Sequence, residues 1–266
     1  MFRPIVRSVF LLIGVFLMYS GANAVSEYVL GAGDIIKVTV FDYPDLTTEV
    51  RVSESGTVTF PLLGELSVGG LSADEAQNLI AERLASGGFI KQAHVSVMVS
   101  QFMSQQVSVI GHVNKPGKYP LSKASTIVDL LAMAGGVGPT GGDTAVLIRP
   151  GKGGGKETRT EIDLYALFQS GESNNIEVIT EDIIFVPRAL VFYIYGEVQH
   201  PGMFRLERNM TIAQAISVGG GLTPKGTDNS VEVKRRDEKG GMRLLDMELH
   251  DQLLADDVLY VKESWF

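Results

Sequence analysis

The side chains that most often carry chemistry are few and scattered in this chain. It has 4 histidines and no cysteine. His94, His112, His200 and His250 never lie three or four residues apart, which is the spacing of two metal ligands on one helical face. Without cysteine there is no disulfide, thiolate zinc site or cysteine nucleophile. We therefore predict no metal site and no cofactor.

The carboxylates do not form a recognisable catalytic pair. Asp42, Asp45, Asp256 and Asp257 lie in segments that we interpret as turns. A glycosidase needs two carboxylates on either side of a sugar cleft, and the sequence leaves that alternative open. No pair stands out, however, and the chain has no G-x-S-x-G nucleophile motif. We predict that the protein is not an enzyme.

Two glycine-rich segments look like nucleotide-binding loops but lack the full patterns. The segment from Arg149 to Lys156 resembles a phosphate loop, yet Glu157 stands where that motif needs serine or threonine. We interpret it as the tip of a hairpin between two strands. Gly31-Ala32-Gly33-Asp34 precedes a predicted strand, whereas a dinucleotide-binding fingerprint opens a helix. We interpret Gly31, Gly33 and Asp34 as a structural turn.

The elements that position these segments fall into three modules, of which residues 25–104 form the first. Its predicted strands cover residues 35–41, 49–52, 57–60 and 93–99. Ser72 and Glu75 have the spacing of a capping box, which predicts the start of a helix. Gly87 and Gly88 predict the end of that helix. This segment is expected to be one compact α+β unit.

The rest of the chain is a module that occurs twice, as residues 105–188 and 189–266. Both copies begin with the motif G-x-V-x-x-P-G, formed by Gly111, Pro116 and Gly117 in one copy and by Gly196, Pro201 and Gly202 in the other. Farther along, Thr126, Gly135, Gly141 and Val146 match Thr211, Gly220, Gly226 and Val231 at the same offset. Such recurrence at a constant offset indicates a structural repeat.

The two copies are predicted to share one plan. A strand enters the proline-glycine pair, which we interpret as a tight turn because proline restricts φ and glycine can take a positive φ. A short strand leads to a helix capped by Thr126 or Thr211, followed by glycines for a left-handed exit. A hairpin and a final strand, 183–186 or 258–261, complete a small mixed sheet. The predicted fold class is α+β, with three tandem small α/β modules, the last two β-grasp-like.

The N-terminal residues 1–24 have the pattern of a secretory signal peptide. Arg3 and Arg7 precede an apolar run over residues 9–18, and Ala22-Asn23-Ala24 is a small-x-small cleavage site. No other segment approaches the ~18 apolar residues of a membrane-spanning helix. The net charge of −8 argues against a nucleic-acid partner, because phosphate binding needs lysine and arginine. We predict a protein secreted through a cleaved signal peptide.

The chain ends with two aromatic residues, Trp265 and Phe266, close behind the last predicted strand. Tryptophan and phenylalanine favour membrane interfaces and protein contacts. A frayed or packed terminus is the alternative. We keep both residues as a candidate membrane or partner contact.

The three modules together resemble a known family. The motifs Tyr28-x-Leu-Gly-x-Gly-Asp34, Val58-x-Phe-Pro-x-x-Gly64 and Gly70-Leu-Ser-x-x-Glu75 resemble the N-terminal domain of outer-membrane polysaccharide export (OPX) proteins. The two G-x-V-x-x-P-G modules resemble the SLBB (soluble-ligand-binding β-grasp) domains that follow it in that family. The resemblance covers nearly all of residues 27–262.

The resemblance implies a function in the periplasm, in association with the outer membrane. It implies a homo-oligomeric ring around an axial channel through which the polysaccharide passes without chemical change. It also implies docking to an inner-membrane chain-length regulator and tyrosine kinase. A periplasmic carbohydrate-binding or scaffold protein that does not conduct the polymer is the alternative reading.

The chain departs from well-known members in two respects. It has no cysteine that could carry a lipid, and too few residues follow Val261 for the terminal helix of about twenty residues that spans the outer membrane in those members. In both respects it looks more like the short members from exopolysaccharide operons of the methanolan type. We therefore expect a separate outer-membrane β-barrel partner to complete the path.

Overall fold

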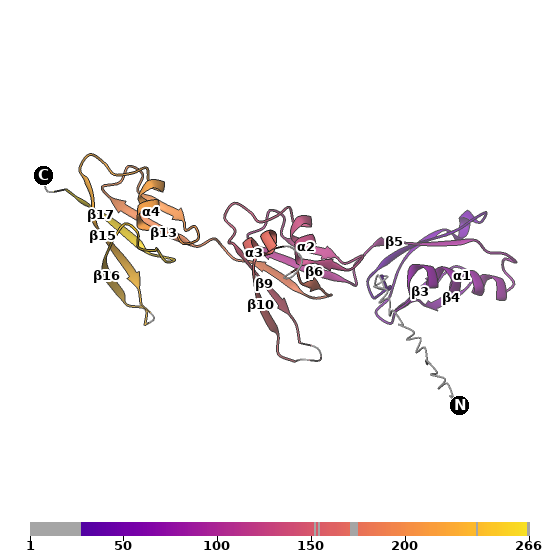
Figure 1. Cartoon of the computed structure of the whole chain (residues 1–266). Helices are drawn as coiled ribbons and strands as arrows, with labels where there is room; N and C mark the ends of the chain where they lie inside the picture. The colour runs from indigo at the N-terminus through magenta and orange to yellow at the C-terminus, as the bar shows by residue number, and fades with distance from the viewer. Residues whose placement is uncertain (1–27, 152, 154, 171–174, 238, 265–266) are drawn as a thin grey trace, which may run out of the picture.

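The structure is a computed structural model that describes residues 28–151, 153, 155–170, 175–237 and 239–264. The predicted signal peptide, Trp265 and Phe266 lie outside the described residues. Three hydrophobic cores follow one another along the chain, over residues 30–97, 107–186 and 192–261. We call the corresponding parts the N-terminal, middle and C-terminal modules, and Figure 1 shows them in a row.

The N-terminal module packs one long helix against a small antiparallel sheet. Its elements are β1 (Ile35–Val40), η1 (Pro44–Leu46), β2 (Thr48–Arg51), β3 (Thr57–Phe60), β4 (Gly64–Ser67), α1 (Ala73–Ser86) and β5 (Val95–Gln101). One sheet has the order β2-β1-β5, and β3 and β4 form a separate hairpin. The predicted capping box is confirmed, since the Glu75 backbone N–H donates to Ser72 and the Ser72 N–H donates to the Glu75 carboxylate. Gly88, with φ of 74°, follows the end of α1 as predicted.

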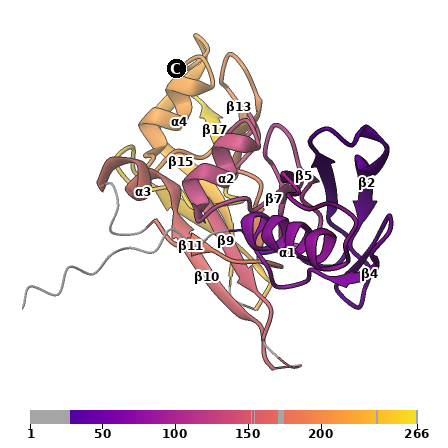
Figure 2. The same cartoon turned by 90° about the vertical axis from the view of Figure 1, so that its right-hand side faces the viewer.

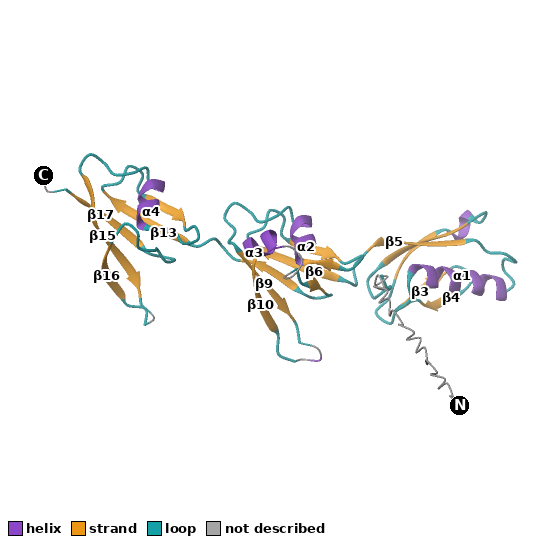
Figure 3. Ribbon diagram, viewed as in Figure 1, coloured by secondary structure: helices purple, strands orange, loops and turns teal. Residues whose placement is uncertain are grey.

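The middle module is a five-stranded mixed sheet with its principal helix on one face (Figure 3). Its sheet has the order β10-β9-β12-β6-β7, in which β12 runs parallel to β6 and the other pairs are antiparallel. Its elements are β6 (Gln106–Gly111), β7 (Gly117–Pro120), β8 (Ser125–Thr126), α2 (Ile127–Met133), β9 (Thr144–Arg149), β10 (Thr158–Asp163), α3 (Leu164–Ser170), β11 (Glu177–Val178) and β12 (Ile183–Val186).

The C-terminal module repeats this arrangement. Its sheet order is β14-β13-β17-β15-β16, again with the first and last long strands of the module parallel. Its elements are β13 (Val191–Gly196), β14 (Gly202–Arg205), α4 (Ile212–Val218), β15 (Gly226–Arg236), β16 (Met242–Met247) and β17 (Val258–Glu263). The predicted α+β class, with a helix over a small mixed sheet, is confirmed in both modules.

The helices α2 and α4 form for the same local reasons. Thr126 and Thr211 cap them, and the predicted boxes with Asp129 and Gln214 are present. Three apolar side chains of each helix face the core, namely Ile127, Leu130 and Leu131 in α2 and Ile212, Ala215 and Ile216 in α4. Each helix is followed by two glycines in the left-handed region, with φ between 75° and 85°. These features agree with the predictions made from the repeat.

The predicted tight turn at the proline-glycine pair is wrong. Gly117 and Gly202 have no positive φ and instead begin β7 and β14. The left-handed residue of the motif is its first glycine, Gly111 or Gly196, where a Cβ would lie 2.2 or 2.3 Å from a carbonyl oxygen of the last strand. The loop between is held by the helix end, since the Lys115 N–H donates to the Ala134 carbonyl at 2.9 Å and the His200 N–H to that of Gly219 at 2.8 Å. Helix carbonyls that have no partner within the helix thus fix the loop.

The offset between equivalent residues of the two copies also changes, by one residue, in the hairpin that precedes the last strand of each copy. Val146 was matched with Val231, but the inward-facing residues are Ala145 and Leu147 in β9 and Val231 and Val233 in β15. The register of β15 against β17 shifts between Gly226 and Val231, which accommodates one extra residue in the second copy. A slip of one residue exchanges the two faces of a strand, so Val146 points away from the core.

Helix α3 was not predicted. Leu164 and Leu167 are buried and lie one helical turn apart, and the Asp163 carboxylate accepts a hydrogen bond from the Ala166 N–H at 3.0 Å. An acidic cap followed by this spacing was the available signal. In the C-terminal module the corresponding residues 248–257 contain no helix, which accounts for the shorter second copy. Within the described residues, no helix is long and apolar enough to cross a membrane.

Candidate functional site

The turn formed by Gly31, Gly33 and Asp34 joins the beginning of the N-terminal module to its end. The Asp34 carboxylate is fully buried and accepts hydrogen bonds from the Gly31 N–H at 2.9 Å and the Tyr28 hydroxyl at 2.7 Å. It also accepts three from the exit of the module, namely those of the Met103 N–H, the Ser104 N–H and the Ser104 hydroxyl, at 2.7–2.8 Å. A side chain at Gly31 would lie 2.6 Å from Ser104, and Gly33 has φ of 92°.

The protonation of this cluster suits structure rather than proton transfer. Burial raises the pKa of Asp34, but the hydrogen bonds from Gly31, Ser104, Tyr28 and Met103 outweigh it, so the pKa lies below its ordinary value. Burial raises the pKa of Tyr28 above its ordinary value. Asp34 is therefore ionised and Tyr28 neutral near pH 7. The cluster positions residues 103 and 104, which lead directly into the middle module.

Two further buried aspartates occupy equivalent places in the repeat, and neither was recognised in the sequence. Asp182 receives a fork of two hydrogen bonds from Arg149, at 2.9 and 2.7 Å, and a third from the Ile179 N–H. Asp257 receives the same fork from Arg235, at 2.9 and 2.7 Å, and a third from the Leu254 N–H. Both carboxylates are fully buried, and Asp257 closes a turn as predicted, since its N–H donates to the Leu254 carbonyl at 3.3 Å.

The Arg149–Asp182 pair lies at the base of the glycine-rich segment that follows Arg149. The hydrogen bonds to Asp182 raise the pKa of the Arg149 guanidinium, and those to Asp257 do the same for Arg235. Arg149 and Thr158 are opposite each other in the antiparallel pair of β9 and β10, as a hairpin requires. The hairpin interpretation is thus confirmed. The signal that sequence reasoning missed was an arginine at the end of the first hairpin strand and an aspartate just before the last strand in both copies.

The junction between the middle and C-terminal modules is made by two arginines of the C-terminal module. Arg205 donates to the Gly141 carbonyl at 3.1 Å and forms an ion pair with Asp143. Arg208 pairs with Asp163 at 2.6 Å and lies over the Tyr165 ring, 5.1 Å from its centroid. A groove of about 460 Å³ runs along this junction. The groove contains charged groups from both modules, and Arg205 and Arg208 are engaged by acids of the middle module.

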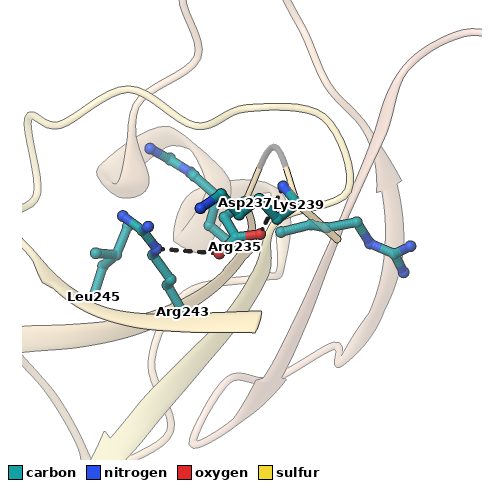
Figure 4. A pocket seen from close by; sticks show the side chains of 6 residues that line it. Arg235, Asp237, Lys239, Arg243 and Leu245 are labelled. Atoms are coloured by element: carbon teal, nitrogen blue, oxygen red, sulfur yellow. Dashed lines mark hydrogen bonds and ion pairs between the residues drawn. The ribbon is translucent and has the colours of Figure 1, made fainter. Parts of the chain in front are cut away.

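A second hollow lies at the tip of the hairpin of β15 and β16 (Figure 4). It is lined by Arg235, Arg236, Asp237, Lys239, Arg243 and Leu245 and has a volume of about 460 Å³. The Asp237 carboxylate accepts from the backbone N–H groups of Lys239 at 3.0 Å and Gly241 at 2.7 Å, which fixes the turn. Its other oxygen lies 3.4 Å from the Arg243 guanidinium. This hollow is the most basic of the described sites.

The histidines and acids do not assemble into a metal centre in the described part of the chain, where no group of three or more such ligands converges. His112 shares a hydrogen bond with the Thr140 hydroxyl at 2.9 Å, and His250 lies beside Glu248 at the surface. The described acids with buried carboxylates are engaged by arginine or by backbone and hydroxyl donors. The geometry offers positioned structural carboxylates, module junctions and a basic hairpin.

Comparison with protein families assigns each module in turn. Residues 22–100 match the model described as polysaccharide biosynthesis/export protein, and residues 105–186 and 191–246 match two models of the SLBB domain. The order is that expected from the sequence motifs. The chain belongs to the OPX family of polysaccharide export proteins.

Individual OPX relatives support this assignment. Over 245 residues the chain is 30% identical to the EPS I polysaccharide export outer membrane protein EpsA of Ralstonia nicotianae, a match that covers 81% of this chain and 62% of that protein. Over 195 residues it is 26% identical to the polysialic acid transport protein KpsD of Escherichia coli, covering 72% and 34%. It is also 27% identical over 134 residues to the exopolysaccharide production protein ExoF of Rhizobium meliloti, covering 46% and 31%. The chain therefore spans less than two thirds of the length of these curated OPX relatives.

Proposed function

We propose that this chain is a component of an exopolysaccharide export machine and acts in the periplasm, in association with the outer membrane. The observation that carries the proposal is the order of an export module and two SLBB modules along nearly the whole chain. Relatives named for polysaccharide export, polysialic acid transport and exopolysaccharide production support it. Cleavage of the signal peptide after Ala24 would release the mature chain into the periplasm.

In this proposal the protein forms a homo-oligomeric ring and the polymer passes through it without chemical change. A hydroxyl-rich chain moves best past many weak polar contacts, because a tight site would stop it. Polymer synthesis and the inner-membrane partner supply the driving force. A ring of identical subunits needs two different surfaces that meet head to tail and close.

The open face of the middle sheet is the surface that we assign to subunit contact. Helix α2 covers one face of this sheet, and the other face carries the apolar side chains Ile110, Val146, Ile148, Ile183 and Phe185. Ile110 is 42% exposed, and the others are half-buried. The solvated face of a mixed sheet normally carries polar residues, so a contiguous apolar face favours a protein contact. A second copy of the chain is the proposed occupant.

Two membrane partners complete the proposed path. An inner-membrane chain-length regulator with its tyrosine kinase would dock to this chain, and a separate β-barrel would carry the polymer through the outer membrane. Co-purification of the tagged chain from cross-linked cells would identify both. Recovery of the tagged chain without any membrane partner would contradict this part of the proposal.

Deletion of the gene tests the function itself. We expect extracellular polysaccharide to fall at least tenfold, with polymer or its precursors retained in the cell, and to return on complementation. Electron microscopy of the purified protein should show rings with an open axis. A stable monomer that binds glycan tightly would instead favour the carbohydrate-binding or scaffold alternative, and normal secretion in the deletion strain would overturn the export role.

A further inference from the structure

The tips of the two equivalent hairpins are basic in a chain whose net charge is −8. Residues 234–243 include five basic and two acidic side chains, and residues 149–159 include four basic and one acidic. Both hairpins extend from their sheets toward the same side of the molecule (Figures 1 and 2). Positive charge is thus concentrated on two projections that share a direction, while the rest of the chain is acidic.

In the described part of the hairpin of β15 and β16, two cations have no acidic side-chain partner. The Arg235 guanidinium is engaged by Asp257, and Arg243 faces Asp237. Among the described residues, Arg236 and Lys239 form no side-chain ion pair, and both belong to the hollow shown in Figure 4. Leu245 supplies an apolar wall. Asp237 ties the backbone of the turn, and the Arg236 and Lys239 side chains are both exposed at its surface.

This arrangement fits an anionic chain better than a neutral one. Guanidinium groups present paired donors that match a carboxylate in two parallel hydrogen bonds. A cluster of like charges beside a hollow raises the local concentration of an oppositely charged ligand. On the second hairpin, Arg149 and Arg159 are paired with Asp182 and Glu157, so the exposed Lys156 gives a long polymer a second and weaker point of contact, which no small anion needs.

We propose that the hairpin of β15 and β16 binds a carboxylate-bearing polysaccharide through Arg236 and Lys239, with the hairpin of β9 and β10 as a second, weaker contact. The proposal rests on the export function and specifies it, because it assigns an acidic polymer as cargo. Each contact is exposed and involves few charges, so the polymer binds weakly and can move on. The acidic remainder of the surface repels the same polymer and restricts it to the hairpins.

Binding of defined polymers to the purified full chain tests this directly. Polygalacturonate is the acidic probe, dextran the neutral probe, and vesicles of phosphatidylglycerol with phosphatidylcholine the lipid probe. We expect polygalacturonate to bind with an affinity that falls steeply with salt, and dextran to bind at least tenfold more weakly. Equal binding of the two polymers, or tighter binding to the anionic vesicles than to polygalacturonate, would overturn the proposal.

The hairpin is tested with the double variant Arg236→Gln and Lys239→Gln. The matched control is Lys37→Gln with Lys91→Gln, which removes the same charge from exposed positions of the N-terminal module. We expect the hairpin variant to bind polygalacturonate at least tenfold more weakly and the control to bind it within twofold of the original chain. An equal loss in both variants would show that net charge alone is responsible and would refute a hairpin site.

Secretion assays separate this inference from the proposed function. If deletion of the gene abolishes secretion while the hairpin variant secretes normally and still binds polygalacturonate, the export role stands and the hairpin site is wrong. If deletion leaves secretion unchanged, the export role itself fails, whatever the purified chain binds.

Discussion

The middle and C-terminal modules repeat the same internal contacts but differ on the sheet face that the helix leaves open. In both, an arginine at the end of the first hairpin strand forks onto a buried aspartate before the last strand. In both, the first glycine of the G-x-V-x-x-P-G motif lies against a carbonyl of the last strand. These shared contacts are the ones on which the β-grasp-like fold depends.

The open face of the C-terminal sheet carries tyrosine and charged side chains beside the exposed Leu244, whereas the central strands of the middle sheet present mainly apolar side chains. Tyr193 and Tyr195 are 40% and 37% exposed, and the rings of Tyr195 and Tyr260 lie 5.0 Å apart. The Lys234 ammonium donates to the Tyr195 hydroxyl at 3.1 Å. Tyrosine and lysine each carry a polar group that water can solvate, whereas isoleucine and valine carry none. The same fold, present twice in this chain, thus carries an open face suited to protein contact in the middle module and one suited to contact with water in the C-terminal module.

The largest expected effect concerns the shared aspartates. Asp182→Ala and Asp257→Ala each remove the acidic partner of an arginine and the acceptor of a backbone N–H, so we expect each to destabilise its own module by about 3 kcal/mol. Amide hydrogen exchange resolved to modules would measure this. Glu157→Ala, which removes an exposed pair with Arg159, is the control and should change stability by less than about 0.5 kcal/mol. A large effect in one module alone would break the equivalence of the two pairs.

The next effect concerns the left-handed glycines. Gly111→Ala and Gly196→Ala place a Cβ against a carbonyl oxygen at a positive φ and should each cost about 2 kcal/mol. Gly117→Ala and Gly202→Ala are matched controls from the same motif, where a Cβ has open space or an ordinary contact and φ is not positive. These should shift the free energy of unfolding by less than about 0.5 kcal/mol. Urea unfolding of the four variants distinguishes the two classes, and similar losses in all four would contradict the assignment.

A smaller effect is expected from exchanging the open faces. Ile148 and Lys234 occupy equivalent outward positions, opposite Ile183 and Val258 of the last strand. Ile148→Lys should weaken self-association at least tenfold, or about 1.4 kcal/mol, because it places a charge in the proposed subunit contact. Lys234→Ile should leave it unchanged. Sedimentation velocity measures both, and the opposite pattern would place the subunit contact on the C-terminal sheet.

The last effect concerns the contribution of Asp34 to the stability of the N-terminal module. It changes little near neutral pH and is clear in acid. Because its pKa in the folded chain lies below the ordinary value, its contribution to stability is fully present above about pH 4 and is lost as pH falls through the lower folded value. We expect the N-terminal module to lose stability over this pH range in an acid titration followed by hydrogen exchange. In Asp34→Asn this pH dependence should be reduced, and an unchanged acid profile would rule out Asp34 as its source.

Local features of this fold could be predicted from the sequence because they depend on neighbouring residues. The capping boxes at Ser72, Thr126 and Thr211 bind a backbone group three residues away, and the glycines after the helices act on their own φ angles. The recurrence of the module also follows from the residues alone, since identical residues recur at one offset. The hairpin interpretation of the glycine-rich segment needed only its position between two strands.

Other features depended on the tertiary structure because they join distant residues or count backbone positions. Arg149 and Asp182 are 33 residues apart, and Arg235 and Asp257 are 22 apart, so their pairing appears only when the hairpin folds back on the last strand. The extra residue before Val231 reverses which side chains of β15 face the core, although a constant offset matched Val146 with Val231. The sequence alone thus determined the three modules, their caps and their family. The fold decided which charges are buried in pairs and which, as at Arg236 and Lys239, have no acidic partner among the described residues, because burial and pairing are properties of packed surfaces.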